Sequence, residues 1–130
     1  MIRGPSGSGK SSLIFGLLEA AEQNENAAAY LVSDDQVCLM NDGGVLIASA
    51  PPTIAGKIEL RGFGIIEKDY LASTRIRLIC DLVEDEKLER LPEPKNVTLE
   101  GVTLPLVELP RRHEQRAVRI TMANINQYVS

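Results

Sequence analysis

The chain has 130 residues, of which 44% are hydrophobic and 25% charged, with a formal net charge of −4 and two cysteines. This length suits one domain with its own core, and no apolar run approaches the roughly 20 residues that span a bilayer. The acidic balance, without clustered Lys and Arg, argues against a nucleic-acid partner. We expect one cytoplasmic domain over residues 1–130 that binds neither nucleic acid nor membrane, with Cys38 and Cys80 as buried free thiols.

A glycine-rich loop lies at the start of the chain and matches the G-x-x-x-x-G-K-[ST] pattern of phosphate-binding loops. Its residues are Gly4, Pro5, Ser6, Gly7, Ser8, Gly9, Lys10 and Ser11. In this pattern the glycines let backbone N–H groups turn toward phosphate, while Lys10 reaches the terminal phosphates and the Ser11 hydroxyl faces Mg²⁺. The pattern predicts a nucleotide triphosphate site; the alternative is a Gly/Ser turn without a ligand.

The elements around the loop are typical of a mononucleotide-binding unit. Only residues 1–3 precede the loop, whereas a typical strand needs about five or six, so we expect a domain truncated at its N-terminus. The apolar residues at 13, 14, 17, 18 and 21 recur at helical spacing, and 24–26 end that helix. Residues 29–32 then read as a buried strand leading into two acids. In such units the ligand lies beyond the carboxyl ends of the strands.

The second half reads as short strands and one helix. Residues 36–40 and 45–49 flank an Asn-Asp-Gly-Gly turn and predict a hairpin, because that turn needs positive φ. A strand is expected at 58–61, and a longer one at 75–83 buries its even-numbered side chains. Residues 97–99 and 102–109 predict another hairpin, with Pro105 favouring an edge strand. A charged loop or helical turn at 84–90 and a helix from Glu114 to Val129 complete an α/β fold with a mixed sheet rich in antiparallel strands.

Two adjacent acids, Asp34 and Asp35, are the first candidates for chemistry beside the loop. Mg²⁺ prefers oxygen ligands, so one acid could hold the metal while the other accepts a proton from an attacking hydroxyl. Such a pair is also common in a turn or helix cap, and this alternative stays open. From spacing alone, Glu59 is an exposed strand carboxylate.

Several cations could pair with phosphate, although each is individually typical of a protein surface. They are Arg61, Arg90, Arg111 and Arg112. His113 precedes the last helix, where we expect it to be exposed or to cap that helix.

Four segments together carry a resemblance to a known family. They are residues 4–11, Leu-Val-Ser-Asp-Asp at 31–35, Ala-Pro-Pro at 50–52 and Ile-Glu-Leu-Arg-Gly-Phe-Gly-Ile-Ile at 58–66. In this order they resemble the catalytic domain of HPr kinase/phosphorylase, particularly its short alphaproteobacterial form. The resemblance continues through 89–91 and 117–124. The loop is generic, whereas segment 58–66 is specific.

This resemblance implies a phosphate-loop fold similar to the nucleotide-binding core of PEP carboxykinase. It implies a kinase that uses ATP and Mg²⁺ to phosphorylate a serine of HPr, the phosphocarrier of the sugar phosphotransferase system. For many members it also implies phosphorolytic dephosphorylation, in which inorganic phosphate is the acceptor and pyrophosphate is released. The expected role is regulation of the phosphotransferase system or carbon metabolism.

The resemblance also implies roles for individual residues. Lys10 binds phosphate, Ser11 lies on the metal side, and Asp34 is the general base or acid. The remaining matches are acids near the metal, Asp35 and Glu59, and a catalytic arginine, Arg90.

Three features depart from the family pattern. The family carries a histidine upstream of the loop, which His113 does not match, and the stretch after Gly64 is shorter than in long members. Long members also continue beyond residue 130 into a helix that helps engage HPr. A homo-oligomer is left open. Two alternatives to a kinase also stay open: a nucleotide-binding regulatory module without turnover, and a small-molecule phosphotransferase.

Overall fold

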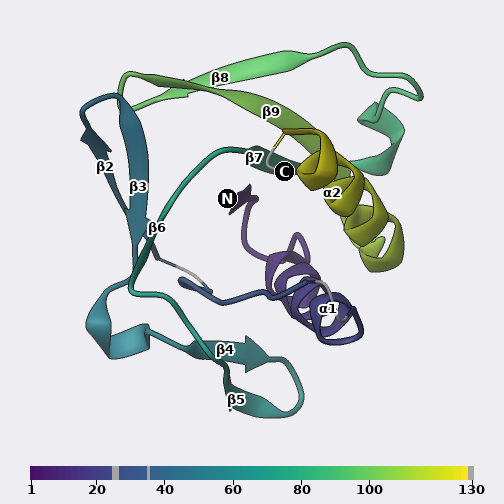
Figure 1. Cartoon of the computed structure of the whole chain (residues 1–130). Helices are drawn as coiled ribbons and strands as arrows, with labels where there is room; N and C mark the ends of the chain where they lie inside the picture. Colours follow the sequence, from purple (N-terminus) through teal and green to yellow (C-terminus); the bar gives the residue numbers. More distant parts are fainter. Residues whose placement is uncertain (25–26, 35, 129–130) are drawn as a thin grey trace.

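The computed structural model describes residues 1–24, 27–34 and 36–128 (Figure 1). In chain order its elements are β1 (Ile2–Arg3), α1 (Lys10–Glu22), β2 (Cys38–Asp42), β3 (Val45–Ser49), η1 (Pro52–Ile54), β4 (Lys57–Leu60), β5 (Gly64–Glu67), β6 (Ser73–Arg75), β7 (Ile79–Val83), η2 (Asp85–Lys87), β8 (Lys95–Leu99), β9 (Val102–Pro110) and α2 (Glu114–Tyr128). The two η elements are short 3₁₀ helices. None of the described helices has both the length and the apolar character needed to cross a membrane.

A four-stranded mixed sheet holds the start of the chain. Its strand order is β1-β7-β9-β8, with β1, β7 and β9 parallel and β8 antiparallel to β9. The strand before the glycine-rich loop has only two residues, yet it is anchored: Arg3 faces Asp81 on β7 and donates to both of its carboxylate oxygens, at 2.7 and 2.8 Å. This strand sets the direction in which the loop leaves the sheet.

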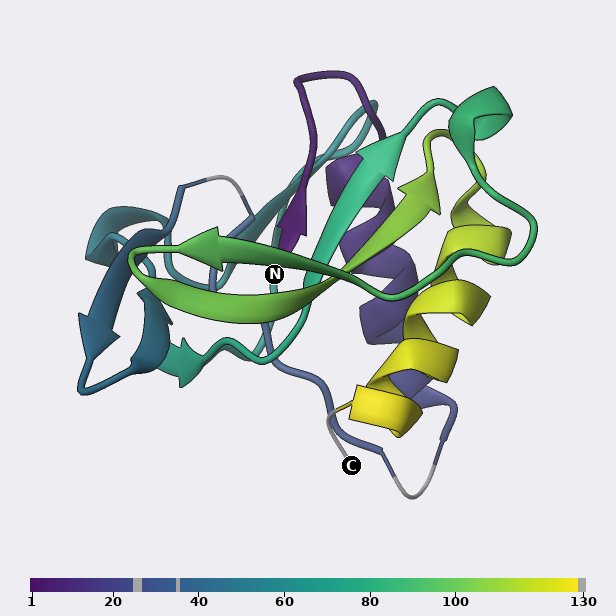
Figure 2. The ribbon, with the colours of Figure 1, turned by 90° about the horizontal axis from the view of Figure 1, so that it is seen from above.

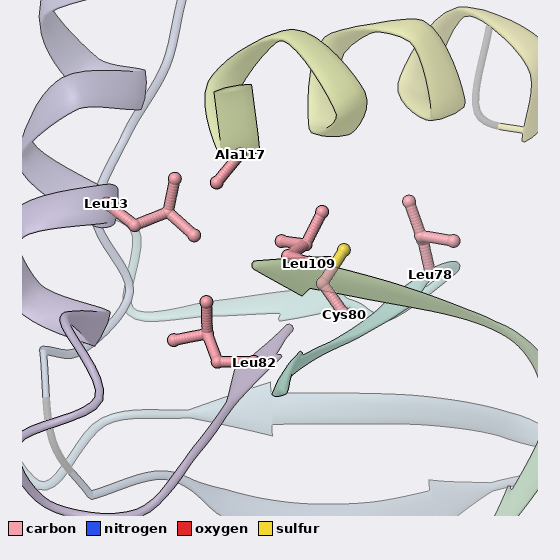
Figure 3. Close-up of a cluster of buried hydrophobic side chains, with 6 residues drawn as sticks. All are labelled: Leu13, Leu78, Cys80, Leu82, Leu109 and Ala117. Atoms are coloured by element: carbon pink, nitrogen blue, oxygen red, sulfur yellow. The ribbon is translucent and has the colours of Figure 1, made fainter. Parts of the chain in front are cut away.

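Two helices cover one face of this sheet and lie side by side (Figure 2). Leu13 of α1 and Ala117 of α2 point toward Leu82 and Leu109 of the sheet, and all four are buried (Figure 3). The helical pattern predicted after the loop is confirmed, because Leu13, Leu18 and Ala21 are its buried positions. The closing helix is confirmed through Tyr128, and Val129 lies outside the described residues. This packing fixes the start of α1 beside the start of α2.

The other face of the sheet packs against a second, antiparallel sheet of order β2-β3-β6. The single strand predicted over 75–83 is therefore wrong, because the chain leaves β6 in one sheet and enters β7 in the other, with 76–78 between them. The even-numbered residues are buried as predicted, but they do not lie on one side as the alternation predicted. Ile76 is buried with Leu46 between the sheets, whereas Leu78 and Cys80 face the helices.

Both predicted hairpin turns are confirmed. Gly43 and Gly44 join β2 to β3 with φ of 63° and 92°. Residues 100 and 101 join β8 to β9, also with positive φ. The edge position expected for Pro105 is wrong, because β9 lies between β7 and β8. Pairing with β7 begins only at Leu106, so the missing N–H of Pro105 falls where β9 has no β7 partner.

The strand predicted at 29–32 is wrong. Leu31 alone forms a bridge, parallel to Tyr70, with its N–H donating to the Asp69 carbonyl at 3.0 Å. Leu31 is buried, but Tyr30 is 53% exposed. The apolar composition of this segment correctly indicated one core contact. It did not make a strand, because only this one residue is paired with a neighbouring segment.

The two cysteines differ in exposure. Cys80 is buried as predicted, and this burial raises the pKa of its thiol. Cys38 is exposed, so its predicted burial is wrong. The reason is its place on β2, an edge strand on which only Leu39 is even partly buried.

We expect a thiol reagent at mildly alkaline pH to modify Cys38 in the native protein, and Cys80 only after unfolding. The thiolate is the reacting form, and both the raised pKa and the burial of Cys80 disfavour it. Peptide mass spectrometry after timed labelling measures both sites. The matched control, Cys38→Ser, removes the fast reaction. Rapid native labelling of Cys80 would contradict the expectation.

Candidate functional site

The glycine-rich loop arches from the end of β1 to the start of α1 (Figure 2). Gly7 and Gly9 have φ of 79° and 90°, a conformation that favours glycine. Between them, the Ser8 N–H donates to the Pro5 carbonyl at 3.1 Å and closes a tight turn. Gly4 is needed for close approach, because a Cβ there would lie 2.6 Å from the Ser8 hydroxyl oxygen. The loop is a narrow turn packed over the end of the sheet.

The N-terminus of α1 has the properties of an anion site. Gly9 caps it without a side-chain hydrogen bond, and its first turn holds no acidic residue. The first-turn N–H groups are therefore available, and the helix dipole places partial positive charge there. The Ser8 hydroxyl is buried and has no partner among the described residues. An unpaired buried hydroxyl and open N–H groups fit a bound phosphate.

Asp34 is the acid that the structure brings to this helix. The Ser11 hydroxyl donates to Asp34 Oδ1 at 2.7 Å, and the Glu59 backbone N–H donates to Oδ2 at 3.1 Å. Ser11 comes from α1 and Glu59 from β4, which pack against each other. A carboxylate oxygen has two lone-pair sites, so each oxygen of Asp34 can still accept another hydrogen. The carboxylate is thus oriented but not saturated.

The other predicted site residues are placed as follows. Lys10 is partly buried, and its ammonium makes no hydrogen bond or ion pair to any described residue. The Glu59 side chain is exposed on β4, so only its backbone joins the site. Arg90 is exposed before β8, and it makes no hydrogen bond or ion pair with Lys10, Ser11 or Asp34 in the described part of the chain. Asp35 lies outside the described residues.

The remaining arginines have diverse environments. Arg111 donates to the Glu84 carboxylate at 3.0 Å and to the Leu82 carbonyl at 3.2 Å, so it links the ends of β7 and β9. Arg61 is exposed in the β4–β5 turn.

His113 lies immediately before α2. Its carbonyl accepts the Ala117 N–H at 2.9 Å, and half of its side chain is exposed. The predicted exposed, helix-capping position of His113 is confirmed.

The oxygen donors beside the loop suit an Mg²⁺ ion that is bound together with substrate phosphates. They do not suit a metal ion that is held by protein side chains alone. Within residues 1–24, 27–34 and 36–128, no group of three or more His, Cys, Asp or Glu side chains could hold a metal ion. Mg²⁺ keeps several waters and takes one or two carboxylates together with substrate phosphates. The Ser11 hydroxyl supplies one oxygen for such an ion at the start of α1, and it is oriented by donating to Asp34 Oδ1 at 2.7 Å.

A cleft of about 350 Å³ lies on another side of the α1 start. Its lining comes from the start of both helices and the ends of β7 and β9: Gly9, Ser12, Leu13, Leu82, Pro110, Arg112, His113, Glu114 and Ala117. Ser12 and Glu114 were missed as site residues. Ser12 directly follows the loop motif, so its place in the sequence could have predicted that it lies near the site. No local sequence pattern predicts that the Glu59 N–H contacts Asp34 or that Glu114 lines the cleft.

The chain is similar in sequence to curated proteins that share one name. No protein-family model matches the chain. HPr kinase/phosphorylase of Limosilactobacillus reuteri DSM 20016 is 30% identical over 122 residues, covering 85% of this chain and 36% of that protein. HPr kinase/phosphorylase of Clostridium botulinum Eklund 17B is 36% identical over 71 residues, covering 55% of this chain and 21% of that protein. The chain thus spans only about a fifth to a third of the length of these curated relatives.

A solved structure shares the fold. It is the HPr(Ser) kinase/phosphatase from Coxiella burnetii, with a TM-score of 0.78, 24% sequence identity, and coverage of 97% of this chain and 85% of that chain. This match confirms the predicted α/β class with its mixed and antiparallel sheets. By sequence the chain is therefore similar to part of curated proteins named HPr kinase/phosphorylase, and by fold it is similar to the HPr(Ser) kinase/phosphatase structure.

Proposed function

We propose that this chain is the phosphoryl-transfer domain of a protein-serine kinase that uses ATP and Mg²⁺ to phosphorylate HPr. The observation that carries the proposal is the contact of the Ser11 hydroxyl with Asp34 at the uncapped start of α1. It combines an acid with a phosphate-binding helix terminus. The named relatives support HPr as the acceptor. The proposed role is regulation of the phosphotransferase system or carbon metabolism.

In this proposal the loop and the start of α1 bind the phosphates. Phosphoryl transfer depends mainly on positioning and on stabilising charge spread over the transferred oxygens. Mg-ATP supplies the phosphoryl group and a counter-charge when bound. Lys10 has no competing partner among the described residues, so its ammonium can turn to the terminal phosphates. The N–H groups of the first turn donate to no capping side chain, so they can donate to the other phosphates of the triphosphate.

Asp34 is proposed to move the proton. In the forward direction its carboxylate accepts the proton of the acceptor serine as the serine oxygen attacks phosphorus. The hydrogen bonds from Ser11 and from the Glu59 amide hold the carboxylate in one orientation. For the reverse reaction, an oxygen of inorganic phosphate attacks the phosphorus of phosphoserine and the bond from that phosphorus to the serine oxygen breaks. Protonated Asp34 gives its proton to the departing serine oxygen, and pyrophosphate is released.

The other predicted site residues are proposed to act around the Ser11–Asp34 contact. Asp35 and the Glu59 carboxylate are proposed to act near the metal. Arg90 is proposed to stabilise the transferred phosphate, which requires the exposed segment before β8 to close over the loop. A homo-oligomer stays a prediction.

The forward reaction is tested by incubating the full chain with HPr and saturating Mg-ATP and measuring HPr by intact mass. We expect one phosphate per HPr, located on serine by peptide fragmentation. A second incubation, of phosphorylated HPr with inorganic phosphate, tests the reverse reaction through release of pyrophosphate. An Asp34→Asn preparation, purified in the same way, reports contaminating kinases. Unmodified HPr at saturating Mg-ATP would overturn the kinase proposal.

One observation favours the alternative of a nucleotide-binding module without turnover. Arg90, the arginine that would act on the transferred phosphate, is exposed and makes no hydrogen bond or ion pair with a described residue of the site. Binding of Mg-ATP by calorimetry, without mass change of HPr in the same preparation, would select this alternative. Mass change of a small-molecule acceptor alone would instead select a metabolite kinase.

A further inference from the structure

Tyr70 lies where two segments that lead to Asp34 come together. Its backbone belongs to the stretch after β5 that pairs with Leu31. There the Leu31 N–H donates to the Asp69 carbonyl at 3.0 Å, and the Leu71 N–H donates to the Leu31 carbonyl at 2.8 Å. Leu31 is only 4% exposed, so these two bonds hold a buried residue. The backbone around Tyr70 therefore fixes a point three residues before Asp34.

The side chain of Tyr70 holds a second point, just before β4. It packs against Gly56, where a Cβ would lie 2.6 Å from Tyr70 Cδ1 and 3.1 Å from Tyr70 Cε1. Gly56 is buried, and its φ of 75° is a conformation that favours glycine. Its carbonyl also accepts the Lys68 N–H at 2.7 Å. This second point lies three residues before Glu59.

The two segments meet again at the site. Asp34 Oδ2 accepts the Glu59 N–H at 3.1 Å, so the hydrogen bond joins the residues to which both segments lead. The contacts thus close on themselves and form what we call the Tyr70 frame. Its members are Tyr70, Leu31, Asp34, Glu59 and Gly56. Because the frame is closed, the separation of Asp34 from the Glu59 N–H depends on the width of the Tyr70 ring at the opposite side.

The Tyr70 side chain is better suited to spacing these segments than to chemistry or to filling the core. It is 51% exposed, so only part of its surface is buried. Its hydroxyl makes no hydrogen bond to a residue in the described ranges, which leaves the flat ring as the contacting part. Without the ring, the backbone at Gly56 can move toward residue 70. A misplacement of about 1 Å at a reacting group can cost about 10²-fold in rate.

We propose that Tyr70 is a positioning residue for phosphoryl transfer, which sets the orientation of the Asp34 carboxylate through Leu31 and Gly56. The inference rests on the proposed function, in which Asp34 accepts the serine proton. The phosphate loop is not a member of the Tyr70 frame. Loss of the ring should therefore lower the rate of transfer and leave phosphate binding unchanged.

The test compares Tyr70→Ala with Tyr70→Phe in the full chain. Tyr70→Ala is expected to lower kcat for HPr phosphorylation about ten- to a hundredfold, with the KM for Mg-ATP unchanged. Calorimetry with Mg-tripolyphosphate, which carries phosphates without a nucleoside, should also show unchanged binding. Tyr70→Phe keeps the ring and should keep the wild-type rate. Tyr128→Ala removes an exposed tyrosine from α2, which packs on α1 and β9, and as the matched control it should change none of these values.

A double-substitution cycle separates positioning from a general effect on the fold. In the Asp34→Asn background, Tyr70→Ala should lower the remaining rate by no more than about twofold, because the side chain at 34 no longer accepts a proton. The same large loss of rate in both backgrounds would assign Tyr70 a purely structural role and overturn the proposal. A wild-type rate in Tyr70→Ala would overturn it as well.

The Glu59 amide reports on the Tyr70 frame without any activity. In Tyr70→Ala, NMR should show a shifted Glu59 N–H signal and a loss of its protection from hydrogen exchange, whereas Tyr70→Phe should match the wild-type chain. An unchanged Glu59 amide in folded Tyr70→Ala would overturn the positioning role. If the wild-type chain phosphorylates no HPr, the proposed function fails, and the amide measurement decides the Tyr70 frame by itself.

Discussion

Replacing Asp34 with Asn is expected to lower the rate of phosphoryl transfer to HPr by about 10²- to 10⁴-fold. The amide keeps an oxygen that can accept the Ser11 hydroxyl, but it cannot take the proton of an attacking serine. Its NH₂ group also cannot accept the Glu59 N–H, which approaches Asp34 Oδ2 at 3.1 Å. Initial rates from intact-mass measurements of HPr at saturating Mg-ATP quantify the loss.

Two comparisons make this prediction specific to the acid. Asp42→Asn removes one exposed carboxylate at the end of β2, away from the loop, and should leave the rate unchanged. Mg-tripolyphosphate binding by Asp34→Asn reports whether the phosphate site survives. A rate equal to that of the wild-type chain would exclude Asp34 as the base. Loss of binding together with the rate would assign Asp34 a structural role at the start of α1.

Truncating Leu109 to Ala is expected to lower the free energy of unfolding by about 2–5 kcal/mol. Leu109 is fully buried at 0% exposure on β9, in the cluster that also holds Leu13 of α1 and Ala117 of α2 (Figure 3). The truncation leaves a cavity where both helices meet the sheet, and these surroundings are fixed by three elements. Urea unfolding followed by circular dichroism measures the change.

The same truncation at an exposed leucine provides the control. Leu91 is 86% exposed before β8, so Leu91→Ala should change the free energy of unfolding by no more than about 0.5 kcal/mol. Equal effects of the two substitutions would contradict the core described around Leu109. Because the cluster includes Leu13 in the second turn of α1, we also expect Leu109→Ala to loosen the packing that holds the phosphate loop.

Features that depend on neighbours in sequence were predictable. The glycine pattern of residues 4–11 indicated the loop, and apolar spacing indicated both helices. Gly43 and Gly44 predicted their hairpin because few other residues adopt positive φ twice in succession. Asp34 was predicted as a site acid from its place after an apolar segment, and segment 58–66 carried the resemblance to the HPr kinase/phosphorylase family. These signals are local, so a single sequence contains them in full.

Tertiary structure alone decided how these pieces meet. Residues 75–83 alternate as one strand would, but two separate sheets each satisfy part of that pattern. Leu31 forms a single β-bridge to Tyr70 instead of a strand. Cys38 is exposed because β2 lies at the edge of its sheet. The Glu59 amide reaches Asp34 only because β4 packs on α1. Every residue except proline offers the same backbone N–H and C=O groups, and long-range pairs depend on the whole fold, so the composition of a segment does not identify its partner.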